Sequence, residues 1–130
     1  MITEDYVSFE LAQLLKIKGF NEPCNSRFYM KTPDCKPVVY LTSVREDFNK
    51  RDLVNTWSRP THQMVMKWLR DEYALFIEIT VGIDLNGDYH YYYSVLDAAC
   101  QYERIRHTNF DWKYEDAVEN AILYCLKYRV

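Results

Sequence analysis

The stretch from Pro60 to Val95 constrains the fold more than any other part of the chain. Apolar residues recur at helical spacing in its first part and at alternate positions in its second part. These are the periods of an amphipathic helix and of half-buried strands. Because the two alternating runs are separated by a short Asn-Gly turn, the stretch predicts a helix followed by a β-hairpin. A helix packed on antiparallel strands is typical of an α+β domain.

The helix of this unit is predicted over residues 61–72. Pro60 is accepted in or just before the first helical turn, where a missing N–H leaves no hydrogen bond unmade. Four apolar residues recur at positions i, i+1, i+4 and i+5 and define one buried face: Met64, Val65, Trp68 and Leu69. We therefore expect Trp68 to lie in the core.

The turn decides the register of the hairpin. A two-residue Asn-Gly turn would place Ile79 opposite Ser94. A three-residue loop with Gly87 in the left-handed region places Ile79 opposite Tyr93 instead. The second register is preferred because it puts the aliphatic row of the first strand and the aromatic row of the second on one face. That aliphatic row consists of Leu75, Ile77, Ile79, Val81 and Ile83.

The remaining chain supplies two more helices and several short strands. Ser8 is a suitable N-cap and Gly19 a suitable C-terminal stop for a helix over 9–18. The further predicted elements are strands at 27–30, 38–41 and 102–106, a long polar loop at 42–59 and a helix at 114–128. Together they predict one α+β domain over residues 1–130. Three helices would cover the aliphatic face of an antiparallel sheet of about four or five strands.

The chain is unusually aromatic, with 12 Tyr, 6 Phe and 3 Trp among 130 residues. Tyrosines pack their rings in a core and keep their hydroxyls wet, so a Tyr-rich core is one interpretation. Aromatic residues are also enriched at binding hot spots, so a binding face is the other interpretation. Phe76, His90 and Tyr92 alternate away from the aliphatic row, and we predict that this set forms an interaction face. In the alternative, Phe48 and Trp57 of the 42–59 segment fold over it.

Charge and cysteine usage restrict partners and location. The net charge is −3 with acids and bases interspersed, which argues against binding duplex nucleic acid. No apolar run reaches transmembrane length, so no membrane partner is expected. The chain starts without a signal-like segment, which predicts a reducing cytoplasmic location. The four cysteines are then expected as free thiols: Cys24, Cys35, Cys100 and Cys125.

Motifs that carry chemistry are missing from the sequence. The His and Cys spacings match no metal site. Residues 84–88 begin like a calcium loop, but the glycine is misplaced and Val95 stands where a bidentate Glu is needed. Phosphate-binding and nucleophile motifs are also lacking. No catalytic, metal-binding or cofactor-binding residue is therefore assigned, and an enzyme is disfavoured.

Four segments carry a resemblance to a known group of proteins: S-F-E-L-A-Q-L-L-K-I-K-G-F, P-T-H-Q-M-V-M-K-W-L-R, F-I-E-I and Y-E-D-A-V-E-N-A-I-L-Y-C-L-K. In this order they resemble small uncharacterised proteins from prophages and mobile elements of gut bacteria. The likeness covers about the first twenty residues and the chain from residue 58 onward, and its motifs are caps, stripes and turns. It implies a bacterial cytoplasm and a phage-borne or integrated gene. The resemblance implies no activity and no functional residue for this chain.

The sequence thus favours a non-enzymatic accessory protein that acts by protein–protein binding, on a partner protein or as a homodimer. Two alternatives stay open. One is a small enzyme with a scattered polar site around the Tyr-rich strand, which would need a pocket with convergent polar groups. The other is a weak single-strand nucleic-acid binder that stacks bases on the sheet tyrosines, which would need a basic rim.

Overall fold

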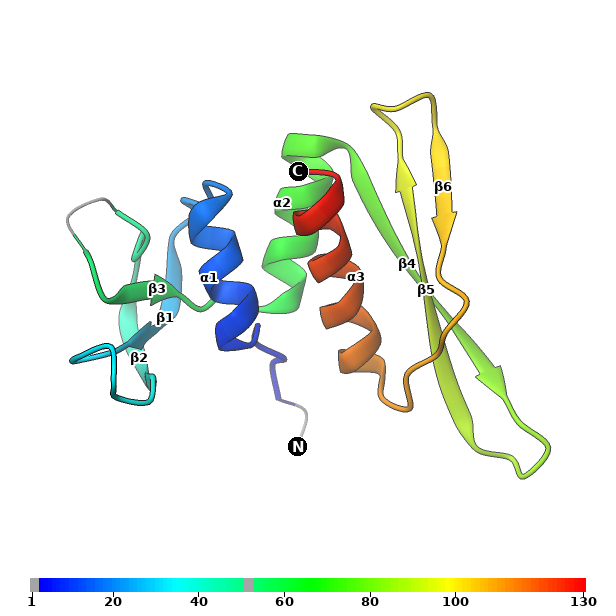
Figure 1. Ribbon diagram of the computed structural model, residues 1–130, viewed down its shortest axis with the longest axis horizontal. Helices are drawn as coiled ribbons and strands as arrows, with labels where there is room; N and C mark the ends of the chain where they lie inside the picture. Colours follow the sequence, from blue (N-terminus) through cyan, green and yellow to red (C-terminus); the bar gives the residue numbers. More distant parts are fainter. Residues whose placement is uncertain (1–2, 51–52) are drawn as a thin grey trace. The chain divides into compact units, whose positions relative to one another are not determined.

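The computed structural model describes residues 3–50 and 53–130, and the chain divides into two compact units that meet between Thr61 and His62. The elements are labelled in Figure 1. The first unit contains α1 (Phe9–Ile17), β1 (Cys24–Tyr29), β2 (Val38–Glu46) and β3 (Thr56–Ser58). The second contains α2 (His62–Tyr73), β4 (Leu75–Ile83), β5 (Tyr89–Asp97), β6 (Glu103–Arg106) and α3 (Tyr114–Tyr128).

The α+β class and the antiparallel pairing are confirmed, but the single sheet of four or five strands is wrong. The strands form two three-stranded sheets, in the orders β2-β1-β3 and β4-β5-β6. The prediction of a long loop at 42–59 is also wrong, because β2 continues to Glu46 and β3 lies at Thr56–Ser58. In the first unit, β1 pairs with β2 on one side and with β3 on the other. The first sheet is therefore built from strands of the first unit.

Polar side chains hold β3 in place. The Asn49 amide nitrogen donates to the Phe20 carbonyl (2.7 Å), and its oxygen accepts from the Ser58 backbone N–H (2.9 Å). The Ser58 hydroxyl accepts in turn from the Phe48 N–H (3.1 Å). Asn49 and Ser58 are buried. These bonds join residues far apart in sequence, so no short stretch of sequence predicts strand β3.

Helix α1 begins and ends as its sequence predicts. The Leu11 N–H donates to the Ser8 hydroxyl (3.2 Å), which satisfies one free donor of the first turn. Gly19 has a φ of +87°, and the Phe20 N–H returns to the Leu15 carbonyl (2.9 Å). This is the Schellman pattern that a C-terminal glycine allows.

In the second unit, α2 and α3 pack on one face of the β4-β5-β6 sheet (Figure 1). Trp68 is buried, as the periodicity of its helix predicts, and Ile122 of α3 is buried as well. The hairpin has the predicted register, with Ile79 opposite Tyr93 and Gly87 at a φ of +84°. Asp84 closes the turn by accepting from the backbone N–H groups of Asn86 and Asp88.

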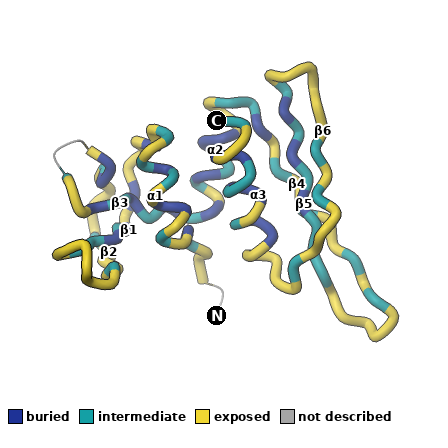
Figure 2. Tube along the Cα trace, viewed as in Figure 1, coloured by how far each residue is buried: buried dark blue, intermediate teal, exposed yellow. Residues whose placement is uncertain are grey.

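The helices cover less of the sheet than expected. Leu75 is buried and Ile77 and Ile79 are half-buried, but Val81 and Ile83 are 55% and 64% exposed. Figure 2 shows the far end of the hairpin as exposed or intermediate. Helix α3 has 15 residues and is about 22 Å long, whereas the 9 residues of β4 span about 30 Å. The prediction that helices cover the whole aliphatic row is therefore wrong for its second half.

Candidate functional site

The face of the β4-β5-β6 sheet that points away from α2 and α3 is the candidate site, and we call it the open face. Side chains alternate along each strand. Leu75, Tyr93 and Val95 are buried on the helix side. The residues next to each of them in the sequence therefore point to the opposite side. The open face is formed by Phe76, Glu78, Thr80, His90, Tyr92, Ser94, Arg104 and Arg106.

Four rings gather at one end of the open face, and we call them the aromatic cluster: His90, Tyr92, Phe110 and Trp112. The ring centres are 5.3 Å apart for His90 and Tyr92 and 4.9 Å apart for His90 and Phe110. Phe110 and Trp112 are also 4.9 Å apart. Phe110 remains 44% exposed and Trp112 59% exposed. The cluster is thus packed internally but open to solvent.

The segment after β6 brings Phe110 and Trp112 to this face. Asp111 exchanges two backbone hydrogen bonds with Tyr91 (2.8 and 2.9 Å), which fixes it beside β5. The Asp111 carboxylate accepts from the Asn120 amide of α3 (3.1 Å), so this side chain points to the helix side. Its two neighbours in sequence consequently point to the open face.

Gly82 sets the position of the His90 ring. The two residues are paired across β4 and β5. A Cβ atom on Gly82 would lie 2.4 Å from His90 Nε2, so the imidazole occupies space that any other residue would fill. The His90 Nδ1 is buried without a hydrogen-bond partner among the described residues. Gly82 thus leaves room for the His90 ring next to β4, where the ring centre is 4.9 Å from that of Phe110.

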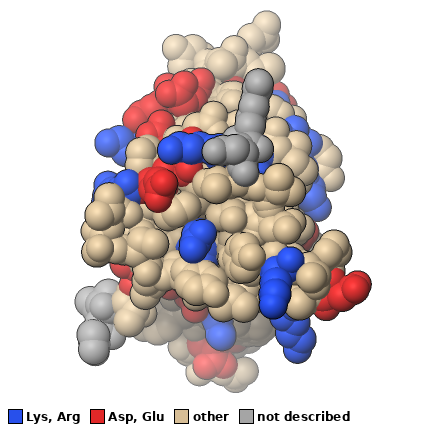
Figure 3. All heavy atoms as spheres, turned by 90° about the vertical axis from the view of Figure 1, so that its left-hand side faces the viewer, with Lys and Arg blue, Asp and Glu red and all other residues tan. Residues whose placement is uncertain are grey.

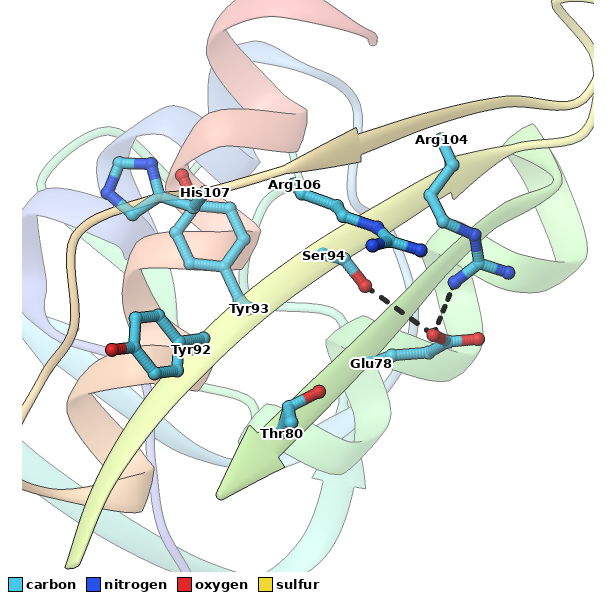
Figure 4. A pocket seen from close by; sticks show the side chains of 8 residues that line it. All are labelled: Glu78, Thr80, Tyr92, Tyr93, Ser94, Arg104, Arg106 and His107. Carbon is cyan, nitrogen blue, oxygen red and sulfur yellow. Dashed lines mark hydrogen bonds and ion pairs between the residues drawn. The ribbon is translucent and has the colours of Figure 1, made fainter. Parts of the chain in front are cut away.

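A polar hollow of about 370 Å³ lies beside the aromatic cluster (Figure 4). Its lining residues are Glu78, Thr80, Tyr92, Tyr93, Ser94, Arg104, Arg106 and His107. The Glu78 carboxylate accepts from the Arg104 guanidinium and from the Ser94 hydroxyl (3.4 Å). Arg106 makes no ion pair with any residue in 3–50 or 53–130, so the hollow carries one unpaired positive charge.

Tyr93 and His107 form the edge of the hollow. Their rings stack with centres 4.5 Å apart, and the His107 N–H donates to the Tyr93 carbonyl (3.0 Å). Burial raises the pKa of the Tyr93 hydroxyl, and the neighbouring Tyr124 raises it further. Tyr93 therefore keeps its proton at neutral pH, and its ring lies on the helix side of the sheet, with its centre 6.3 Å from that of Tyr124 in α3.

The three residues predicted as an interaction face are only partly brought together. His90 and Tyr92 are half-buried members of the aromatic cluster. Phe76 is 38% exposed and lies beyond Glu78, opposite Leu96 at the other end of the face. Phe48 and Trp57, named as the alternative cover, contact residues of the first unit. Phe48 binds Ser58 and Trp57 packs on Phe9, all within the first unit.

Sequence reasoning missed the two arginines and the two other rings of this face. The signal for Phe110 and Trp112 was a short alternation, Asn-Phe-Asp-Trp, in a stretch without other strand character. Arg104 and Arg106 alternate with Ile105 in a strand that was recognised only as an edge. Both signals are too short to fix a face without the strands beside them.

The site offers little for catalysis or metal binding. Among the described residues, no three His, Cys, Asp or Glu side chains are grouped so that they could hold a metal ion. The Ser94 hydroxyl lies 3.4 Å from a carboxylate that Arg104 already binds, and Glu78 is half exposed to water. An activated nucleophile needs a closer base.

Charges elsewhere on the molecule are mixed. On the side seen in Figure 3, basic and acidic side chains are interspersed. In the described part of the chain, no helix has the length and apolarity needed to cross a membrane.

Compared with known proteins, the chain matches no family model, no curated protein and no solved structure.

Proposed function

We propose that this protein is a non-enzymatic binding protein whose open face receives a partner protein. The observation that carries the proposal is the exposed aromatic cluster lying beside the unpaired Arg106. Trp, Tyr and Arg are the residues most enriched at binding hot spots. We further propose that the protein is an accessory factor of a phage or mobile element, acting in the bacterial cytoplasm. The resemblance of its helices and turns supports that setting.

Solvent exposure of the cluster gives association its driving force. An aromatic side chain offers roughly 150–250 Å² of surface, and burying apolar area stabilises by about 25 cal/mol per Å². Phe110 and Trp112 leave about half of their surface in water, as measured by their exposed fractions of 44% and 59%. Covering both rings would therefore contribute on the order of 4–6 kcal/mol before the costs of association.

The hollow indicates what the partner presents next to its apolar side chains. Arg104 is neutralised by Glu78, whereas Arg106 has no acidic partner among the described residues. A guanidinium favours a carboxylate because it donates two parallel hydrogen bonds. We therefore expect an Asp or Glu of the partner in the hollow, with an aromatic or aliphatic residue on Trp112.

Single-strand nucleic acid is the second candidate ligand. The observation that favours it is the placement of two arginines beside exposed rings on a sheet surface, a combination that binds stacked bases and phosphates. It ranks second because Glu78 already occupies Arg104 and the net charge of the chain is −3. Fluorescence anisotropy with labelled oligonucleotides separates the candidates. Salt-sensitive binding that Arg106→Gln weakens would favour nucleic acid.

Affinity capture from bacterial cells that carry the element tests the leading proposal. Tyr92→Glu places a charge in the cluster, and Trp112→Ala removes its most exposed ring. Both variants should lose the partner that the wild type captures, while circular dichroism shows an unchanged fold. Tyr102→Glu is the matched control, because Tyr102 is exposed and lies in the turn between β5 and β6. A partner retained equally by all three variants contradicts the proposal.

A further inference from the structure

We infer that a second copy of this chain pairs with the free edge of β4, antiparallel and centred on Ile79, to form a continuous six-stranded sheet. This inference goes beyond the proposed function, since it concerns the strand edge and not the open face. Three observations carry it: the orientation of the backbone groups, the lack of protection at this edge, and the bare half of the aliphatic row.

In the described part of the chain, the backbone of β4 presents hydrogen-bonding groups that face away from β5 at regular intervals. Tyr91 exchanges both backbone bonds with Asp111, and the Tyr93 carbonyl accepts from His107, so both residues turn their groups away from β4. Directly opposed residues in an antiparallel ladder share this orientation. Their partners Val81 and Ile79 therefore point their N–H and C=O groups outward. Strand alternation extends this to the whole aliphatic row: Leu75, Ile77, Ile79, Val81 and Ile83.

Bonds at the two ends of the ladder agree with this orientation. The Ala98 N–H donates to the Ala74 carbonyl (3.0 Å), and the Asp84 N–H donates to the Asp88 carbonyl (3.0 Å). The even-numbered residues of β4 thus face β5. Among the described residues, β4 has β5 as its one strand neighbour, so the outward groups of the row line an open edge.

This edge lacks the devices that normally prevent pairing. Exposed edges are usually short, charged, bulged or interrupted by Pro. Strand β4 has nine residues, no Pro and one charged residue, Glu78, which Arg104 neutralises. By contrast, β6 has four residues with three charges, and the pairing of β2 is broken by a register shift. Strand β4 is therefore the edge best suited to accept another strand.

A second copy fits because the row is self-complementary. Centred on Ile79, antiparallel pairing places Ile77 opposite Val81 and Leu75 opposite Ile83 of the other copy. All of these residues point their backbone groups outward, and all of their side chains lie on the helix side. The exposed half of the aliphatic row in one copy, Val81 and Ile83, then lies beside the half of the other copy's row that α2 and α3 cover. Glu78 falls opposite Thr80, so no like charges are directly opposed.

Amide hydrogen exchange measured at low and high protein concentration tests the inference. In the monomer, the outward N–H groups of Ile77, Ile79 and Val81 exchange quickly, while those of Glu78 and Thr80 are protected by β5. In the dimer, all five are protected. Dimerisation through any other surface leaves the first three fast at every concentration, and that result would overturn the inference.

A proline substitution provides the second test. Val81→Pro removes an outward N–H that takes no part in the β4-β5 ladder, and Pro is accepted at an edge strand on its solvent side. In sedimentation, the wild type should have twice the chain mass of 15.7 kDa and Val81→Pro the single mass. Val81→Ile keeps the N–H and the apolar side chain and should remain dimeric.

Three sedimentation results contradict the inference. These are a wild type that is monomeric at its highest soluble concentration, a Val81→Pro variant that remains dimeric, and a dimer that Tyr92→Glu dissociates. The last result would place the contact on the open face instead. If Val81→Pro fails to fold, the alternating exchange pattern of the wild type decides alone.

Discussion

At the scale of single residues, the buried thiol of Cys125 makes the free energy of unfolding depend on pH in the alkaline range. Burial raises the pKa of this thiol from its ordinary value of 9.0 to about 12. Above pH 9 the unfolded chain releases the proton while the folded chain keeps it. The stabilisation is therefore complete below about pH 9 and is lost as the pH rises toward 12.

The Cys125→Ala variant checks this dependence. At neutral pH it should be less stable than the wild type, because a small cavity replaces the sulfur. The difference in free energy of unfolding should shrink by about 1.4 kcal/mol for each pH unit above the ordinary thiol pKa. Urea unfolding of both proteins at about pH 8 and about pH 10 measures this. A difference that stays constant would mean that the thiol is accessible in the folded state.

Gly87 is the residue on which the hairpin register depends. Its φ of +84° lies in the region that L-residues avoid, and the Asp84 carbonyl accepts its N–H (3.0 Å). Gly87→Val should lower the free energy of unfolding by more than about 1 kcal/mol, because a β-branched residue is penalised there. Leu85→Val, at a fully exposed position of the same turn, is the control. Equal urea midpoints for the two variants would contradict this reading of the turn.

At the scale of elements, the sequence predicted those whose signals are local. The cap at Ser8, the stop at Gly19 and the register of the hairpin all arise from residues within a few positions of one another. Strand β3 was missed because Thr56 and Ser58 are buried without being apolar. Its anchors are distant: the Lys16 ammonium donates to the carbonyls of Leu53 (2.7 Å) and Thr56 (2.6 Å).

The candidate site shows the same division between local and distant signals. His90 and Tyr92 were identified because strand alternation points them away from the aliphatic row. Phe110 and Trp112 join them because Asp111 between them exchanges backbone bonds with Tyr91 of β5 and accepts from the Asn120 amide of α3. The clustering of these rings depends on where α3 packs, and that packing is a tertiary property that no short window of sequence contains.

Helix α2 offers a test of element packing. Trp68 is 7% exposed, and its ring lies 5.1 Å from that of Tyr73. Trp68→Ala should lower the free energy of unfolding by roughly 3–5 kcal/mol, as large-to-small core changes do. Lys67→Ala on the exposed side of the same helix should change it by less than about 0.5 kcal/mol. Similar losses for the two variants in urea would mean that α2 presents a different face to the sheet.

At the scale of the whole molecule, the number of sheets could not be predicted from the sequence. Each strand pattern specifies which side chains are buried, but not which strand lies next to it. Strand β1 has neighbours on both sides within the first unit, and β5 has the same within the second. Both proposed surfaces, the open face and the β4 edge, belong to the second unit.

These two surfaces would act together if both proposals hold. Pairing at β4 is related by a twofold axis perpendicular to the sheet, so the open faces of the two copies lie on the same side. A dimer would then bind two partner molecules displayed close together, and linked binding raises the apparent affinity by roughly 10²–10⁴-fold. We expect slow dissociation from a densely coated partner surface and faster dissociation from a sparse one.

Surface-binding kinetics of three proteins separate the two contributions. Val81→Pro should dissociate at the fast rate from both surfaces, because each monomer keeps its open face but loses its second attachment. Tyr92→Glu should bind neither surface while remaining a dimer. Val81→Ile should behave as the wild type. A Val81→Pro variant that still dissociates slowly from the dense surface would show that binding is not bivalent, since its single open face would then account for the whole affinity.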